Sequence, residues 1–203
     1  MIKAFFFDYD GVLTKDKTGS FTTSKYLSQA LGIQHSKVQS AFRLYNKELT
    51  LGLISHSDIW SEICQHLGQA INIELLYEAF ESTPINTEMF LLAQRLKDSY
   101  VVGLITDNKK DRMDHLKKVQ PLSQTFNPII VSAEVGADKS SSKIFLYALE
   151  FAHLFPAECI FIDNNEANLK TASILGFKTI FHDDEKNDIA KLTDCLKDMG
   201  IRI

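Results

Sequence analysis

Apolar and polar positions divide the chain into blocks of two kinds. Short, nearly continuous apolar runs occur at five places: residues 2–8, 100–106, 128–132, 158–163 and 177–181. Longer segments separate the last four runs, and apolar residues recur there at helical spacing, as they do in residues 144–152. Strands that alternate with helices in this way predict βαβ units. We therefore expect an α/β fold, with a doubly wound parallel sheet and helices on both of its faces.

The first apolar run leads into a pair of carboxylates. In "FFFDYDGVLT" (residues 5–14), three phenylalanines come directly before Asp8, and Asp10 follows after one residue. An apolar run without polar alternation is typical of a strand buried on both faces, at the centre of a parallel sheet. Open α/β sheets bind their ligands beyond the carboxyl ends of the strands. Both carboxylates are therefore predicted to lie at the ligand-binding edge of the sheet.

The segment between the first and second runs is far longer than a simple crossover. A crossover needs only about a dozen residues, whereas residues 15–83 show repeated helical spacing and no strand-like run. Gly32, Gly52 and Gly68 separate the helical stretches, and Pro84 marks the return to the sheet. We expect a small helical insertion at residues 15–83, inserted into a core formed by residues 1–14 and 84–203.

Composition limits the classes of protein to consider. Of the 203 residues, 45% are apolar and 24% are charged, as is typical of a globular protein with a sizeable core. The net charge of −4 does not suggest a nucleic-acid partner, and three widely spaced cysteines do not suggest a disulfide framework or a zinc site. No run resembles a membrane-spanning or targeting segment. We expect a cytoplasmic protein without membrane or nucleic-acid partners.

Polar side chains follow four of the predicted strands. They are Asp8 and Asp10 after the first strand, Thr106, Asp107 and Asn108 after the second, Lys139 after the third, and Asp163 and Asn164 after the fourth. Because the carboxyl ends of parallel strands share one edge of a sheet, we expect these side chains to converge. Carboxylate and amide oxygens suit a hard cation such as Mg²⁺. A cation, a lysine and a hydroxyl together suit a phosphoryl group.

These residues resemble the four motifs of the haloacid dehalogenase superfamily, most of whose members are phosphatases. The first motif is the strand followed by "DYDGVLT" (8–14). The others are "GLITDN" (103–108), Lys139 in "VGADKSSSKIF" (135–145), and "FIDNNEANLKTASILGF" (161–177). They occur in the family's order, and the insertion resembles the family's small α-helical cap in place and length. The resemblance implies a Rossmann-like catalytic core at 1–14 and 84–203, with a cap at 15–83.

The resemblance also implies a role for each residue. Asp8 would attack phosphorus and form an aspartyl-phosphate, while Asp10 would protonate the leaving alkoxide and then deprotonate water. The predicted phosphate-binding residues are Thr106, Asp107 and Lys139. The predicted Mg²⁺ ligands are Asp8, Asp10 through its backbone carbonyl, Asp163 and Asn164. The expected function is a Mg²⁺-dependent phosphatase that hydrolyses a small phosphorylated metabolite. Dehalogenases of this family generally lack an acid at the position of Asp10.

Three positions depart from the family's usual pattern. Asp107 stands where relatives often have Asn, and Asn164 stands where they often have Asp. The residues after Lys139 are "SSS" (140–142), where Pro-Asp-Pro is common. Because an amide oxygen is neutral, Asn164 is predicted to bind Mg²⁺ less tightly than a carboxylate would. The loop that follows Lys139 is predicted to be less rigid.

Other interpretations of these residues stay open at the level of sequence. Thr106 and Asp163 could each cap the helix that follows them. Lys143 lies close enough to compete with Lys139 for the third motif. A phosphomutase of the same family would share all four motifs, and a non-catalytic descendant that binds a ligand through its cap is another alternative.

Overall fold

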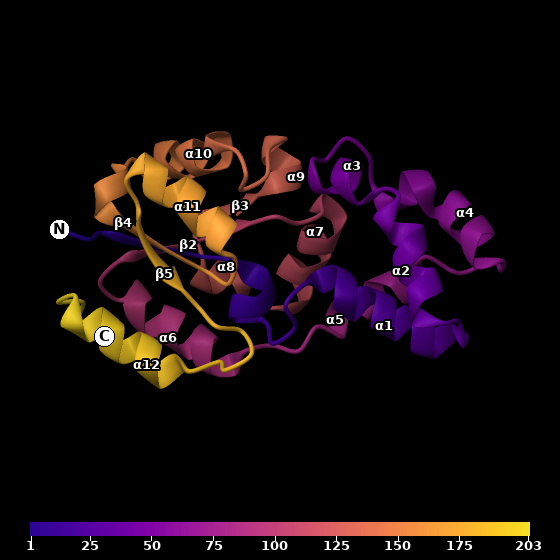
Figure 1. Ribbon diagram of the computed structural model, residues 1–203, viewed down its shortest axis with the longest axis horizontal. Coiled ribbons are helices and arrows are strands. Elements are labelled where there is room, and N and C mark those ends of the chain that lie inside the picture. Colours follow the sequence, from indigo (N-terminus) through magenta and orange to yellow (C-terminus); the bar gives the residue numbers. More distant parts are fainter.

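The computed structural model describes all 203 residues and contains one five-stranded sheet (Figure 1). The strands lie in the order β3-β2-β1-β4-β5, and each neighbouring pair is parallel. Their bounds are β1 (Ala4–Phe7), β2 (Val101–Thr106), β3 (Ile129–Val131), β4 (Cys159–Asp163) and β5 (Lys178–Phe181). Each strand lies within one of the five apolar runs. The predicted α/β fold with a parallel sheet is therefore confirmed.

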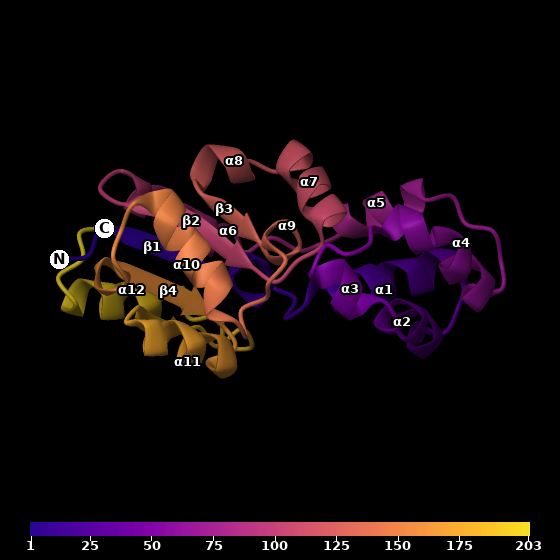
Figure 2. The ribbon, with the colours of Figure 1, turned by 90° about the horizontal axis from the view of Figure 1, so that it is seen from above.

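The central strand β1 is apolar on both faces because helices cover both faces of the sheet. Phe5 and Phe7 pack into a core cluster on one face, and Phe6 packs into a second cluster on the other, all without exposed surface. The first face is covered by α6 (Thr87–Lys97), α7 (Lys110–Val119), α8 (Leu122–Thr125) and α12 (Ile189–Asp198). The second is covered by α10 (Ser142–Ala152) and α11 (Glu166–Leu175) (Figure 2).

Residues 15–83 contain five helices and no strand, as the sequence predicts. These helices are α1 (Gly19–Leu31), α2 (His35–Arg43), α3 (Asn46–Thr50), α4 (His56–Leu67) and α5 (Glu74–Glu81). Figures 1 and 2 both show these helices grouped beyond the carboxyl ends of the strands, at the opposite end of the molecule from the two termini. We call residues 15–83 the cap segment; the division of the chain into core and cap at these residues stays a prediction.

The cap segment is joined to the core on two sides. Its two connections lie side by side, where Thr14 and Ile85 form an isolated antiparallel bridge. Farther away, the Ser132 hydroxyl of α9 (Ser132–Val135) donates to the Thr50 carbonyl of α3 at 2.8 Å. These contacts hold the cap helices over the edge of the sheet where the predicted site residues lie. None of the helices combines the length and the apolar composition that crossing a lipid bilayer requires.

Candidate active site

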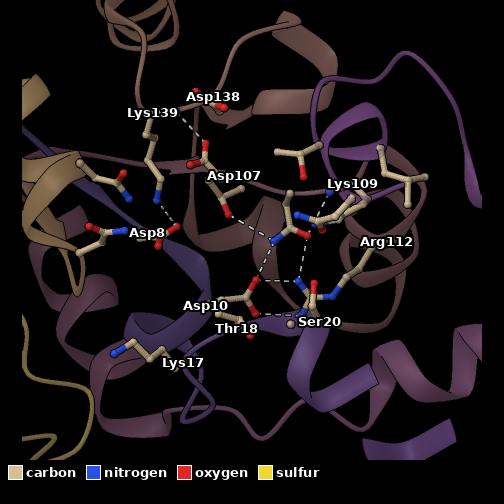
Figure 3. A pocket seen from close by; sticks show the side chains of 18 of the residues that line it. Asp8, Asp10, Lys17, Thr18, Ser20, Asp107, Lys109, Arg112, Asp138 and Lys139 are labelled. Carbon is tan, nitrogen blue, oxygen red and sulfur yellow. Dashed lines mark hydrogen bonds and ion pairs between the residues drawn. The ribbon is translucent and has the colours of Figure 1, made fainter. Parts of the chain in front are cut away.

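A cavity of about 710 Å³ lies between the carboxyl ends of the strands and the cap segment. Of the seven predicted site residues, six line this cavity: Asp8, Asp10, Thr106, Asp107, Lys139 and Asn164. The seventh, Asp163, is fully buried at the end of β4 and contacts the others through Lys139. Residues that are up to 156 positions apart therefore meet at one edge of the sheet, which is what the parallel topology predicts (Figure 3).

The loop that follows β1 turns sharply within the segment η1 (Tyr9–Leu13). The Asp8 carboxylate begins this turn, because its Oδ1 accepts a hydrogen bond from the Tyr9 backbone N–H at 2.8 Å. Gly11 completes it with a φ of +77°, and a Cβ at this position would overlap the Asn164 side chain. Glycine is therefore required at residue 11 both for the backbone conformation and for the close approach of the β4 loop.

Lys139 is the cation at the floor of the cavity. Its side chain is 1% exposed, and its Nζ lies 2.8 Å from Asp8 Oδ1 and 2.7 Å from Asp163 Oδ2. Burial alone would lower the pKa of Lys139, but the neighbouring carboxylates, with Asp8 the strongest, raise it above its ordinary value. Lys143 is exposed at the start of α10. The structure therefore favours Lys139 over Lys143 as the lysine of the third motif.

The two carboxylates nearest to Lys139, those of Asp8 and Asp163, differ in how many of their oxygens the protein engages. Burial raises the pKa of Asp8 from 3.8 to about 8, although the Lys139 ammonium opposes the shift. Asp8 Oδ1 is held by Lys139 and by a backbone N–H, while Oδ2 has no hydrogen-bond partner. Asp163 accepts from Lys139, from the Asn165 N–H at 2.7 Å and from Asn168 Nδ2 at 3.1 Å. Asp8 thus presents a free oxygen to the cavity, whereas both oxygens of Asp163 are engaged by the protein.

Neither Thr106 nor Asp163 caps a helix. Helix α7 starts at Lys110. Its N-cap residue is Lys109, whose side chain makes no capping hydrogen bond. Helix α11 is capped by Asn165, whose side chain accepts from the Ala167 N–H at 2.9 Å. The capping alternative that the sequence left open is therefore excluded for both residues, and their position at the edge of the sheet needs another explanation.

Asp10 lies apart from the other carboxylates and faces a cation that the sequence analysis did not identify. Arg112 on α7 donates from Nη1 to Asp10 Oδ2 at 2.7 Å and from Nη2 to Asp10 Oδ1 at 2.9 Å (Figure 3). Asn108 Nδ2 also donates to Asp10 Oδ2, at 2.9 Å. A signal was present in the sequence: Arg112 lies next to Met113 and four residues before Leu116, which are both buried, so its side chain starts from the inner face of α7.

A family comparison agrees with this geometry. The sequence matches the haloacid dehalogenase-like hydrolase family over residues 2–176, which is most of the chain. The chain is a haloacid dehalogenase-like hydrolase. Its sheet, its four motifs and the helical segment after the first motif are those that the sequence resemblance implied.

Three relatives show how far this likeness extends. Bifunctional epoxide hydrolase 2 of Rattus norvegicus is 26% identical over 208 residues, which cover 92% of this chain but only 37% of the rat protein. D-ribitol-5-phosphate phosphatase of Bacteroides thetaiotaomicron is 22% identical over 190 residues, covering 88% of this chain and 91% of that protein. A solved structure of a haloacid dehalogenase family enzyme from the same bacterium, in complex with magnesium and inorganic phosphate, has a TM-score of 0.72 at 24% identity. It covers 89% of this chain and 94% of that one, and the likeness shows a common fold.

The oxygen donors at the cavity of this hydrolase suit a Mg²⁺ ion that the protein itself binds weakly. No group of three or more His, Cys, Asp or Glu side chains is arranged to enclose a metal ion. Mg²⁺ is usually bound by one or two carboxylates, by waters and by substrate phosphate, and does not need an all-protein cage. The Asp8 carboxylate and the amide of Asn164, which lies against Gly11, provide a donor set of this size.

A second lysine at the cavity was also missed by the sequence analysis. Lys109, directly after Asn108, lines the cavity, and its ammonium makes no hydrogen bond or ion pair in the structure. Burial lowers the pKa of Lys109 to about 8, and the charge of Arg112 adds to the effect. Nothing in the four motifs distinguishes this lysine from the exposed Lys110 beside it, so only its position in the fold identifies it.

Proposed function

We propose that this hydrolase is a Mg²⁺-dependent phosphatase that acts on a small phosphate monoester. The observation that carries the proposal is the buried ammonium of Lys139 between Asp8 and Asp163 at the floor of the cavity. A fixed cation at this point offsets the charge of a carboxylate nucleophile and of the phosphate that it attacks. The phosphatase relative and the family enzyme bound to magnesium and phosphate support the same proposal.

In the first half-reaction, Asp8 Oδ2 attacks phosphorus and the bond from phosphorus to the ester oxygen breaks. Oδ2 is the suitable atom because it has no hydrogen-bond partner, while Oδ1 is fixed by Lys139. Asp10 transfers a proton to the departing alkoxide. Thr106 and Lys139 bind the non-bridging phosphate oxygens, with the charge of Lys139 strengthening its hydrogen bonds.

In the second half-reaction, water attacks the aspartyl-phosphate. Asp10 takes the proton of the water, the bond between phosphorus and Asp8 breaks, and its electron pair returns to the Asp8 carboxylate. Inorganic phosphate leaves the cavity. Asp10 is therefore required twice, first as an acid and then as a base.

The proposed Mg²⁺ would be held by four residues: Asp8, Asp10 through its backbone carbonyl, Asp163 and Asn164. When bound, it neutralises charge on the phosphate and on the nucleophile. Because Asn164 supplies a neutral oxygen, we expect the substrate phosphate to contribute a large part of the affinity for the ion.

The lining of the cavity favours a polar leaving group. Only 4 of its 26 lining residues are hydrophobic. The cap segment contributes Thr18 and Ser20 close to Asp10 (Figure 3), and Thr23 also lines the cavity. Hydroxyl groups can hydrogen-bond to a hydroxylated or charged leaving group, whereas they make poor contacts with a lipid chain. We therefore expect small, water-soluble phosphate esters to be preferred over phosphorylated lipids.

The test is a pre-steady-state assay with an aryl phosphate, run with Mg²⁺ and with EDTA. An aryl alcohol is a good leaving group, so Asp10→Asn should still form the aspartyl-phosphate and then stall. We expect a burst of aryl alcohol no larger than the enzyme concentration, with phosphate trapped on Asp8. Asp8→Asn should show neither burst nor turnover, while Asp98→Asn, a change at an exposed carboxylate at the end of α6, should behave as wild type.

Each alternative predicts a different result in the same assay. A phosphomutase would transfer the phosphoryl group to a second hydroxyl of a sugar phosphate and release little inorganic phosphate. A binding protein would give no burst and no labelled Asp8 in any variant. Steady turnover by Asp10→Asn at the wild-type rate would refute the proposed acid–base role.

A further inference from the structure

Arg112 is fully engaged with Asp10 although no motif includes it. Its side chain is 3% exposed, that of Asp10 is 14% exposed, and the two groups form a bidentate ion pair. Burial alone would lower the pKa of Arg112, but the Asp10 carboxylate raises it. A bidentate pair between a guanidinium and a carboxylate fixes direction as well as distance, because two parallel hydrogen bonds leave little freedom of rotation. The side chain of Asp10 is therefore held in one orientation.

The guanidinium is itself enclosed by the two connections of the cap segment. Its Nη2 donates to Thr83 Oγ1 at 3.2 Å, on the connection that returns from α5. A Cβ on Gly19, at the start of α1, would overlap the guanidinium carbon and both of its terminal nitrogens. The ring of Tyr9 lies 5.5 Å from the guanidinium carbon. Both ends of the cap segment thus meet at the group that holds Asp10.

The position of the Arg112 side chain leaves one of its own hydrogen-bond donors without a partner. Arg112 Nε is buried and has no hydrogen-bond partner. A buried donor without a partner destabilises the folded state. The terminal nitrogens nevertheless contact Asp10, Asn108 and Thr83. The contacts at the end of the side chain therefore determine where the guanidinium lies.

We propose that Arg112 is a positioning residue that orients Asp10 for proton transfer. This inference rests on the proposed phosphatase function. Asp10 must reach the water that attacks the aspartyl-phosphate, and misplacement of a reacting group by ~1 Å can lower a rate about 100-fold. In that step the water proton moves to Asp10, an oxygen–phosphorus bond forms, and the bond from phosphorus to Asp8 breaks. Arg112 takes no proton and contacts neither phosphorus nor water.

The proposal predicts a specific kinetic pattern for Arg112→Gln with an aryl phosphate. Formation of the aspartyl-phosphate hardly needs an acid with this leaving group, so kcat/KM should stay near the wild-type value. Hydrolysis of the intermediate needs an oriented base, so kcat should fall about 10- to 100-fold, and KM should fall with it. A burst of aryl alcohol and phosphate trapped on Asp8 should accompany the change. Arg112→Lys keeps the charge without the bidentate geometry. Its kcat should lie between those of wild type and Arg112→Gln.

Gly19→Ala tests the same idea without altering any charged group. The new methyl group displaces the guanidinium, and the backbone of Gly19 has no positive φ, so the substitution is compatible with the start of a helix. We expect the burst and the joint decrease of kcat and KM to appear here too. Gln29→Ala, at an exposed position on the same helix, is the control.

The possible outcomes separate this inference from the proposed function. If wild type does not turn over aryl phosphates, or Asp10→Asn gives no burst, the phosphatase proposal fails first. If those two behave as expected but Arg112→Gln, Arg112→Lys and Gly19→Ala all keep wild-type kcat, the positioning role is refuted. It is also refuted if kcat/KM falls in proportion to kcat and no phosphate accumulates on Asp8, because that is the pattern of a structural role.

Discussion

Replacing Lys139 by methionine should destabilise the fold strongly. The substitution keeps the length and volume of the side chain but removes an ammonium that lies 2.8 Å from Asp8 and 2.7 Å from Asp163. Removing one partner of a buried ion pair costs about 3–5 kcal/mol, because the remaining charge has no compensation. For a chain of this size, each kcal/mol lowers Tm by about 2–4 °C. We therefore expect Tm to fall by about 6–20 °C.

The loss should depend on pH in a defined direction. With Lys139 present, the pKa of Asp8 in the folded protein is already raised from 3.8 to about 8. Without the ammonium it should rise further, so between pH 3.8 and the raised value the folded state binds more protons than the unfolded state. Stability falls as the pH rises through that window, and this fall ends near pH 8 in wild type but continues to higher pH in the variant. The deficit of Lys139→Met relative to wild type should accordingly be larger at pH 8.5 than at pH 5.

Thermal and urea denaturation in EDTA at both pH values would measure the deficit. Lys143→Met is the matched control, because it makes the same change at an exposed lysine four residues away and should shift Tm little. If Lys139→Met is as stable as Lys143→Met, the buried ion pair does not exist in solution. If its deficit is the same at both pH values, the two carboxylates are not the source of the instability.

Three further substitutions test neighbouring parts of the site. Asn164→Asp adds a carboxylate to the proposed Mg²⁺ ligands, so less Mg²⁺ should be needed to raise its Tm than the Tm of wild type or of the control Asn165→Asp. Identical titrations of the three proteins would place residue 164 outside the metal site. Lys109→Met removes an ammonium whose pKa burial lowers to about 8. Inhibition by inorganic phosphate should therefore weaken in wild type as the pH rises through 8, and this change should be absent from Lys109→Met. The same pH profile in both proteins would exclude Lys109 from phosphate binding. Gly52→Ala sets a Cβ against a backbone carbonyl of α9 at a φ of +69°, so its Tm should fall further than that of Gly68→Ala, which has a φ of +83° and no close backbone neighbour; equal decreases would contradict the close approach.

The strands could be predicted from the sequence for a physical reason. Central strands of a parallel sheet are buried on both faces, so they read as apolar runs and need no alternating pattern. Helix α3 could not be predicted in this way, because five residues are too few to show a helical period. Its place depends on a tertiary contact between the Thr50 carbonyl and Ser132.

The spacing of the motifs predicted which residues reach the edge of the sheet, but not how they pair. Asp8 and Asp10 are two residues apart in sequence, yet Asp8 contacts Lys139 and Asp10 contacts Arg112. The separation arises where the extended strand ends at Asp8, with a ψ of 161°, and the chain enters the η1 turn, so that Asp10 leaves the line of the strand. Arg112 itself lies on a helix among other charged residues, so its partner is apparent only once α7 is placed against the loop after β1.

The departures from the family pattern at Asp107 and after Lys139 are connected in the structure. Asp107 Oδ1 accepts a hydrogen bond from the Lys139 backbone N–H at 2.9 Å. Asp107 also contributes to the raised pKa of the Lys139 ammonium. The loop that lacks the common prolines is thus fixed at the residue whose position matters most, by a carboxylate that relatives often replace with an amide. Asn164 has no such compensation, since the extra carboxylate at Asp107 serves the lysine. The weakness that the sequence predicts for the metal site should therefore persist in the folded protein, which is why the Mg²⁺ titration of Asn164→Asp is informative.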